Sequence, residues 1–105
     1  VNVFANDVEK VLNSHNQIME SAIIGVKHKF LGEVICAFII TKKNQLFEEE
    51  TIQRYCSKLL ADYQMPFYYK VVKKFPRGRL NKVSKYKLKL EYKYQIWNYW
   101  KIFIY

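Results

Sequence analysis

The feature that most constrains the fold is a continuous apolar run over residues 34–41. It is rich in β-branched side chains, which are Val34, Ile35, Ile39 and Ile40. A run of this kind is typical of a strand that is buried on both faces. Residues 19–26 form a second extended stretch with an apolar centre, and a polar loop that ends at Gly32 separates the two. The two stretches are close enough in the sequence to pair as an antiparallel hairpin.

Helix signals lie on both sides of this hairpin. Three acids, Glu48 to Glu50, precede the clearest one, where apolar side chains recur at i, i+3, i+4, i+7 and i+8. Asn6 and Glu9 read as a capping box at the start of another helix, behind the tail of a strand over residues 1–5. Residues 85–94 alternate strictly in polarity, which taken alone predicts a strand, although Leu, Lys and Glu are good helix formers and Ser84 can cap a helix. The helix expected over residues 84–95 is what a resemblance to a known family, carried by the motifs below, implies.

These signals together predict an α+β domain. Its small mixed or antiparallel sheet has three strands, over residues 19–26, 33–41 and 67–75. Helices over residues 6–14, 48–61 and 84–95 pack with that sheet. The aromatic-rich residues 93–105 are expected to be a separate C-terminal extension.

The charge balance favours functions with anionic partners. The 105 residues carry 18 Lys and Arg against 9 Asp and Glu, a formal net charge of +9. Such a balance favours nucleotides, polyphosphates, nucleic acid, an acidic membrane or an acidic protein face.

His15, His28, Cys36 and Cys56 lack metal-ligand spacing, so no metal site is expected, and the two cysteines are expected to be free thiols in a cytoplasmic protein. No apolar run is long enough for a membrane span, and no signal peptide is visible.

One loop stands out as a candidate site. Residues 75–85 hold one Pro, one Gly and several cations, with no acid before Glu91. The loop lies between a predicted strand and a predicted helix, and folds usually place a reactive or binding group on such a loop. We therefore expect Lys82 to be held out toward an anionic, phosphate-bearing ligand.

Three sets of residues, in order along the chain, resemble one known family. The first is residues 2–9 (NVFANDVE), and the second is residues 20–26 (ESAIIGV) with 32–33 (GE) and 37–40 (AFII). The third is residues 60–66 (LADYQMP) with 75–77 (FPR) and 81–83 (NKV). Together they are similar to motifs of the C-terminal domain of the AMP-forming adenylating enzymes, which include acyl- and aryl-CoA synthetases, amino-acid adenylation domains and luciferases.

The chain departs from the family pattern in its loop. Asn81 stands where the family places Gly before its catalytic lysine, and Gly78 stands in place of the usual Thr. Asn tolerates the left-handed backbone region better than most residues, so the loop can keep its shape. The resemblance implies that Lys82 is the catalytic lysine and that Pro76, Arg77, Gly78 and Asn81 support its loop.

The resemblance implies a two-step ligase. A carboxylate attacks the α-phosphate of ATP, which is bound with Mg, to give an acyl-adenylate and pyrophosphate. The thiol of CoA or of a carrier-protein phosphopantetheine then displaces AMP. The large N-terminal adenylation domain would hold most of the ATP and acid pockets, while residues 1–92 would be the mobile C-terminal domain without its first hairpin and hinge. The chain alone is then expected to be inactive.

Two points stay open at the level of sequence. Lys27, His28 and Lys29 are placed to approach the phosphates of the thiol donor, or they form a plain solvated turn. A small basic nucleic-acid-binding module is a competing function, for which Tyr68, Tyr69 and the lysines near them are suited. However, the sequence holds no nucleic-acid-binding motif, and nucleic acid is not expected as a partner. A non-catalytic regulatory or interaction domain with the same fold is the other alternative.

Overall fold

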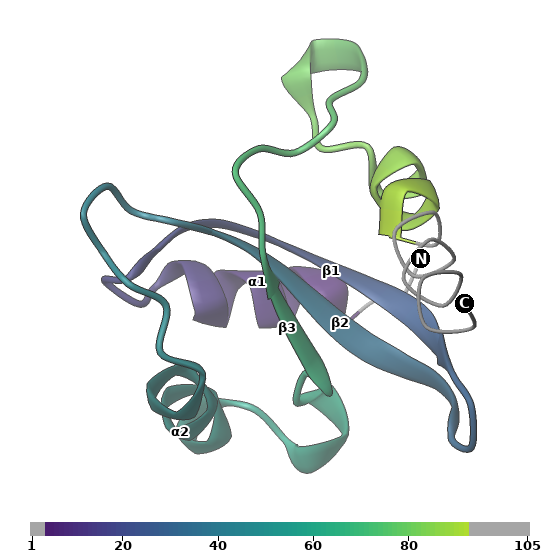
Figure 1. Ribbon diagram of the computed structural model, residues 1–105. Helices are drawn as coiled ribbons and strands as arrows, with labels where there is room; N and C mark the ends of the chain where they lie inside the picture. Colours follow the sequence, from purple (N-terminus) through teal and green to yellow (C-terminus); the bar gives the residue numbers. More distant parts are fainter. Residues whose placement is uncertain (1–3, 93–105) are drawn as a thin grey trace, which may run out of the picture. The chain divides into compact units, whose positions relative to one another are not determined.

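The computed structural model describes residues 4–92, and Figure 1 traces the remaining residues in grey. The predicted C-terminal extension and the first residues of the predicted N-terminal strand lie outside that range. The chain divides into two units, residues 1–74 and residues 75–105.

The sheet of the first unit has three strands in the order β1-β2-β3 (Figure 1). β1 (Ile18–His28) and β2 (Gly32–Thr41) form the predicted antiparallel hairpin, with Ile23 opposite Ala37. β3 (Tyr68–Val71) lies parallel to β2, which makes the sheet mixed. The α+β prediction is therefore confirmed. The third strand is shorter than the predicted residues 67–75, because pairing with β2 ends at Val71.

Two helices bury one face of this sheet. α1 (Ala5–Asn13) contributes Val8 and Leu12 to the core, and α2 (Glu49–Leu59) contributes Ile52 and Cys56. They share that core with side chains of the hairpin, namely Ile18, Ile23, Ala37 and Ile39. Residues 36–40 of β2 are all buried, as predicted for a strand that is covered on both faces.

The predicted capping box at the start of α1 is wrong. The helix begins at Ala5, one residue early, and Phe4 at its N-cap position makes no side-chain hydrogen bond. Glu9 is instead committed elsewhere: its carboxylate accepts a hydrogen bond of 2.8 Å from the backbone N–H of Ile23 in β1. The motif therefore joins the helix to the sheet. The predicted strand over residues 1–5 is also wrong at its end, since Phe4 lies in a turn and Ala5 is helical.

The segment after α2 leaves the helix earlier than predicted. Leu60 is already extended, with φ −117° and ψ 151°, so the helix ends at Leu59. A short 3₁₀ helix, η1 (Asp62–Gln64), follows, and the Gln64 side chain accepts a hydrogen bond of 3.0 Å from the N–H of Ala61. This turn directs the chain into β3.

The second unit consists of a loop and the start of a helix within its described residues. Residues 85–92 are helical, in agreement with the predicted helix, whose further course lies outside the described range. The Ser84 hydroxyl accepts a hydrogen bond of 3.3 Å from the N–H of Lys87, which confirms Ser84 as the helix cap. The loop before it holds η2 (Arg79–Asn81) and the candidate site.

Candidate functional site

The loop of residues 76–84 is a tight hairpin closed by backbone hydrogen bonds. Arg77 and Val83 form an antiparallel bridge. Below it, the N–H of Ser84 donates to the carbonyl of Pro76 at 2.8 Å. Above it, the N–H of Gly78 donates to the carbonyl of Lys82, also at 2.8 Å. These bonds fix the stem, so the conformation of the tip decides where residues 79–82 point.

The tip is a left-handed turn. Leu80 and Asn81 have φ of 58° and 61°, and the N–H of Lys82 donates to the carbonyl of Arg79 at 3.2 Å. Two successive positive φ values with this hydrogen bond are the features of a type I′ turn. The expectation that Asn81 takes the left-handed region in place of Gly is confirmed. Gly78 does not supply a positive φ, since its φ is −111°.

Leu80 is the strained residue of this turn, and the sequence reasoning missed it. A left-handed conformation destabilises a residue with a Cβ by roughly 1 kcal/mol. The Leu80 side chain is 89% exposed, so burial within the described residues does not offset that strain. Backbone strain of this kind gathers at functional sites.

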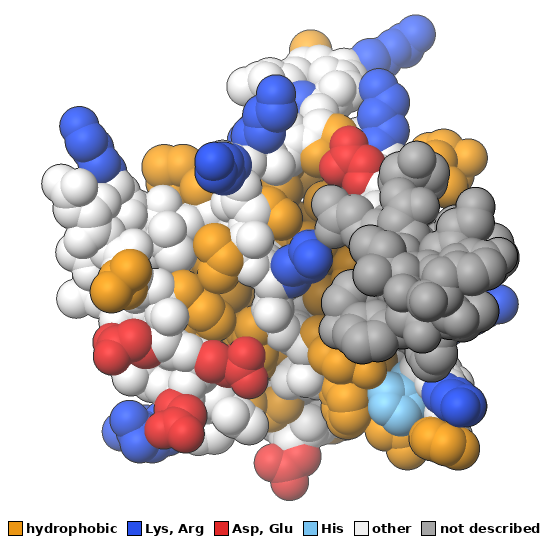
Figure 2. All heavy atoms as spheres, in the orientation of Figure 1, with side chains coloured by type: hydrophobic (Ala, Val, Ile, Leu, Met, Phe, Trp, Pro, Cys, Tyr) orange, Lys and Arg blue, Asp and Glu red, His pale blue; other side chains and the backbone are white. Residues whose placement is uncertain are grey.

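Lys82 leaves the turn in an extended conformation with its side chain exposed. The side chains of Lys82 and Arg79 have no hydrogen-bond, ion-pair or ring partner within residues 4–92. Figure 2 shows Lys and Arg side chains projecting from the surface of the loop. The arrangement therefore offers a free ammonium that a rigid turn carries outward, suited to an anion held by another surface.

Arg77 makes a side-chain hydrogen bond to the tip of the loop. Its guanidinium Nη1 donates to the carbonyl of Asn81 at 3.0 Å. That carbonyl belongs to the peptide that joins Asn81 to Lys82. Of the four residues expected to support the loop, Arg77 and Asn81 thus contact each other directly, while Pro76 and Gly78 contribute backbone bonds.

The second predicted set, Lys27, His28 and Lys29, lies at the tip of the β1–β2 hairpin in the first unit. Lys27 and His28 are the last residues of β1, and Lys29 follows in the turn. The His28 Nδ1 accepts hydrogen bonds from the N–H groups of Phe30 and Leu31, at 3.1 and 3.0 Å. His28 therefore shapes the turn, and its Nδ1 is not available to a ligand.

Aromatic side chains surround His28. The sequence reasoning did not predict these aromatic neighbours. The His28 ring meets the Phe67 ring edge-on at 5.0 Å and stacks on Tyr68 at 6.4 Å. The Lys29 ammonium lies 5.6 Å from the centre of the Phe30 ring. Phe30 itself is 82% exposed. An apolar Phe-Leu pair inside a polar loop was the available signal for this exposed aromatic tip.

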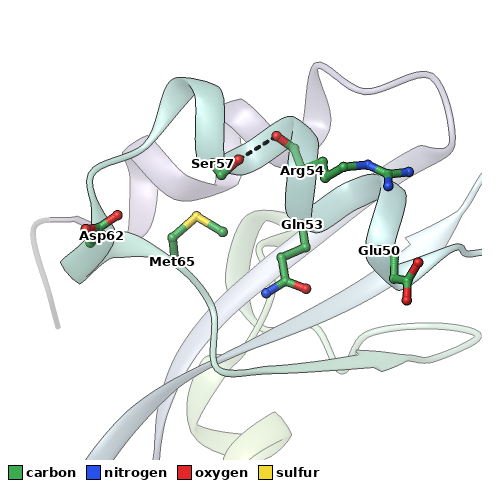
Figure 3. A pocket seen from close by; sticks show the side chains of 6 residues that line it. All are labelled: Glu50, Gln53, Arg54, Ser57, Asp62 and Met65. Atoms are coloured by element: carbon green, nitrogen blue, oxygen red, sulfur yellow. Dashed lines mark hydrogen bonds between the residues drawn. The ribbon is translucent and has the colours of Figure 1, made fainter.

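A separate hollow lies on the outer side of α2, away from both predicted sets in the sequence. It has a volume of about 510 Å³ and is shown in Figure 3. Its lining side chains come from α2 and from the η1 segment and are Glu50, Gln53, Arg54, Ser57, Asp62 and Met65. The Ser57 hydroxyl donates to the carbonyl of Arg54 at 2.8 Å (Figure 3). The hollow thus mixes both signs of charge, and its hydroxyl is already engaged.

The two cysteines are buried, free thiols, as predicted. Burial raises the pKa of the Cys36 thiol to about 12, and the nearby Lys70 ammonium opposes that rise. Burial likewise raises the pKa of the Cys56 thiol to about 11. Neither thiol is a nucleophile near neutral pH, because the thiolate is the reactive form.

Within residues 4–92, no cluster of three His, Cys, Asp or Glu side chains is arranged to hold a metal ion. The helices of that same range are too short or too polar to cross a membrane.

Fold and loop together define a small α+β domain that presents one lysine on a left-handed turn. Residues 7–82 match the model of the AMP-binding enzyme C-terminal domain, and the chain belongs to this family. The resemblance found in the sequence is thereby confirmed.

The curated relatives and solved structures that resemble the chain are acyl-CoA ligases and related enzymes. The chain is 34% identical over 88 residues to the mitochondrial medium-chain acyl-CoA ligase ACSF2 of Danio rerio, a match that covers 84% of this chain and 14% of that protein. Apo MatB from Rhodopseudomonas palustris superposes with a TM-score of 0.80 at 30% identity, covering 89% of this chain and 19% of that one.

A third match is o-succinylbenzoate CoA synthetase (MenE) from Bacillus subtilis, solved in complex with its acyl-adenylate intermediate. It has a TM-score of 0.74 at 30% identity and covers 81% of this chain and 17% of that one. The chain therefore spans less than a fifth of the length of these proteins.

Proposed function

We propose that this chain is the mobile C-terminal domain of an ATP-dependent, AMP-forming ligase that joins a carboxylic acid to a thiol. In this proposal Lys82 supplies the positive charge for acyl-adenylate formation. The observation that carries it is the exposed, unpartnered Lys82 side chain directly after the left-handed turn. The family membership supports the same reading, since it extends up to residue 82.

The role of Lys82 follows from where charge develops in the reaction. When the carboxylate attacks the α-phosphate of ATP, negative charge builds on the phosphoryl oxygens and on the leaving pyrophosphate. An ammonium that is already in position stabilises this charge more in the transition state than in the ground state. The same ammonium aligns the carboxylate and the nucleotide for attack. A rigid turn suits this task better than a mobile loop does.

The remaining parts of the machinery belong to partners of the domain. An N-terminal adenylation domain would hold ATP, its Mg and the acid, so the chain alone would not turn over. CoA or an acyl carrier protein would deliver the thiol in the second step. Lys27 and Lys29 would approach the phosphates of that thiol donor from the β1–β2 tip. His28 would keep that tip in shape through its bonds to the turn.

Tyr69 is the residue at which the nucleic-acid alternative fits the structure poorly. A stacking platform needs exposed aromatic faces. Tyr69 is half-buried and its ring packs against Phe47 at 5.9 Å. We propose the cytoplasm as the compartment, because both cysteines are free thiols. The Danio rerio relative is named as mitochondrial.

The test is pyrophosphate exchange in the ligase that carries this domain. Lys82→Ala should lower the rate of ATP–pyrophosphate exchange by about 10²- to 10³-fold, the usual effect of removing one transition-state donor. Lys73→Ala is the matched control, since Lys73 is an exposed lysine outside the turn. The proposal fails if the two substitutions lower exchange to the same extent.

A further inference from the structure

We infer that Arg77 is a positioning residue, which holds the turn that aims Lys82. This inference rests on the proposed function of Lys82. It starts from a single bond: the Arg77 guanidinium donates to the carbonyl of Asn81, the residue before Lys82, at 3.0 Å. Through that bond Arg77, in the hairpin stem, fixes the orientation of the peptide that sets the direction of the Lys82 side chain.

The turn needs this hydrogen bond because its own backbone is strained. Leu80 and Asn81 both have positive φ, and the Leu80 side chain is 89% exposed, so no packing within the described residues stabilises the left-handed form. If the Asn81 carbonyl is released, its peptide can rotate and Asn81 can return to a commoner backbone region. The Lys82 side chain would then leave the hairpin in another direction.

Arg77 is also well placed to stay fixed itself. Its backbone forms the antiparallel bridge with Val83, so the guanidinium starts from the bridged part of the stem. An Arg side chain offers several N–H donors in a rigid planar fork, which suits the capture of a carbonyl oxygen. The neighbouring Arg79 has the same charge, but its side chain has no recorded partner within residues 4–92.

Arg79 therefore provides a control that separates the bond from the charge. In the ligase that carries this domain, Arg77→Gln should lower the rate constant of adenylation by about 30-fold, because misplaced catalytic groups lose rate rather than binding. The KM for ATP should change by less than about threefold. Arg79→Gln, which removes the same charge from the same turn, should change the rate constant by less than about twofold.

A second variant separates positioning from direct contact with substrate. Gly adopts the left-handed region without the clash that Leu suffers, so Leu80→Gly should keep the turn formed without the guanidinium. We expect the loss caused by Arg77→Gln to shrink from about 30-fold to about fivefold in the Leu80→Gly background, with Leu80→Gly alone close to the wild type. If Arg77 touches the substrate directly, the loss stays the same in both backgrounds, and the inference is overturned.

The 105-residue chain itself gives a readout that does not depend on activity. Amide hydrogen exchange at Lys82 and Gly78, whose N–H groups close the turn, should be about tenfold faster in Arg77→Gln, since both bonds open with the turn. Unchanged exchange at both amides overturns the inference whatever the kinetics show. Suppose that exchange is faster in Arg77→Gln, but Lys82→Ala leaves the adenylation rate unchanged. That result would support the role of Arg77 in holding the turn and would overturn the proposed function of Lys82.

Discussion

Substitution of Glu9 tests how the first helix is attached to the sheet. Its carboxylate is partly buried and accepts the Ile23 N–H of β1 at 2.8 Å. Glu9→Ala removes a charged acceptor and leaves that N–H without its partner. Hydrogen bonds to charged groups contribute about 1.5–3 kcal/mol, so we expect Glu9→Ala to lower the free energy of unfolding by about 2 kcal/mol. In a domain of this size that corresponds to a melting temperature lower by roughly 8–16 °C.

The assay is urea unfolding of the 105-residue chain, followed by circular dichroism. Glu9→Gln keeps an acceptor oxygen without the charge, so it should lose about 1 kcal/mol, between the wild type and Glu9→Ala. Lys10→Ala is the control, since Lys10 is the exposed neighbour on the same helix. If Glu9→Ala and Lys10→Ala unfold at the same urea concentration, the bond to β1 contributes nothing and the reasoning is refuted.

Two further predictions concern buried groups of the core. The Tyr69 hydroxyl is buried without a hydrogen-bond partner, so Tyr69→Phe should raise the free energy of unfolding by up to about 1 kcal/mol; a destabilised variant in the same urea assay would contradict this. The pKa values of Cys36 and Cys56 rise from 9.0 to about 12 and about 11 on folding. The unfolded chain therefore loses these protons first, and stability should fall as pH rises from about 9 toward 12. A Cys36→Ala, Cys56→Ala double variant should lose less stability than the wild type over this pH range. If both proteins show the same pH dependence, the prediction is contradicted.

The sequence predicted the parts of the fold that depend on hydrophobic pattern. The run over residues 34–41 lies in a strand whose residues 36–40 are all buried, because an uninterrupted apolar stretch has no side suited to water. The 3.6-residue period after Glu50 gave α2, although its end was placed too late. Leu60 continues the apolar pattern but has left the helix, and a pattern of side chains does not show where backbone hydrogen bonds stop.

Long-range contacts could not be predicted from local patterns. Glu9 sits where a capping box would use it, yet it bonds to Ile23, fourteen residues away. The parallel pairing of β3 with β2 likewise depends on the path of the chain between them, which runs through α2 and η1. For the candidate site, the left-handed Asn81 was foreseen because Asn tolerates that conformation. The left-handed Leu80 was not foreseen, since nothing in a Leu residue favours positive φ.

The most direct test of the central claim compares the two half-reactions in the ligase that carries this domain. We expect Lys82→Ala to slow acyl-adenylate formation from acid and ATP by about 10²-fold or more, because the α-phosphorus is attacked, and pyrophosphate leaves, only in that step. When the acyl-adenylate is supplied ready-made, the same variant should transfer the acyl group to the thiol within about threefold of the wild-type rate. Equal losses in both half-reactions, or no loss in the first, would contradict the account.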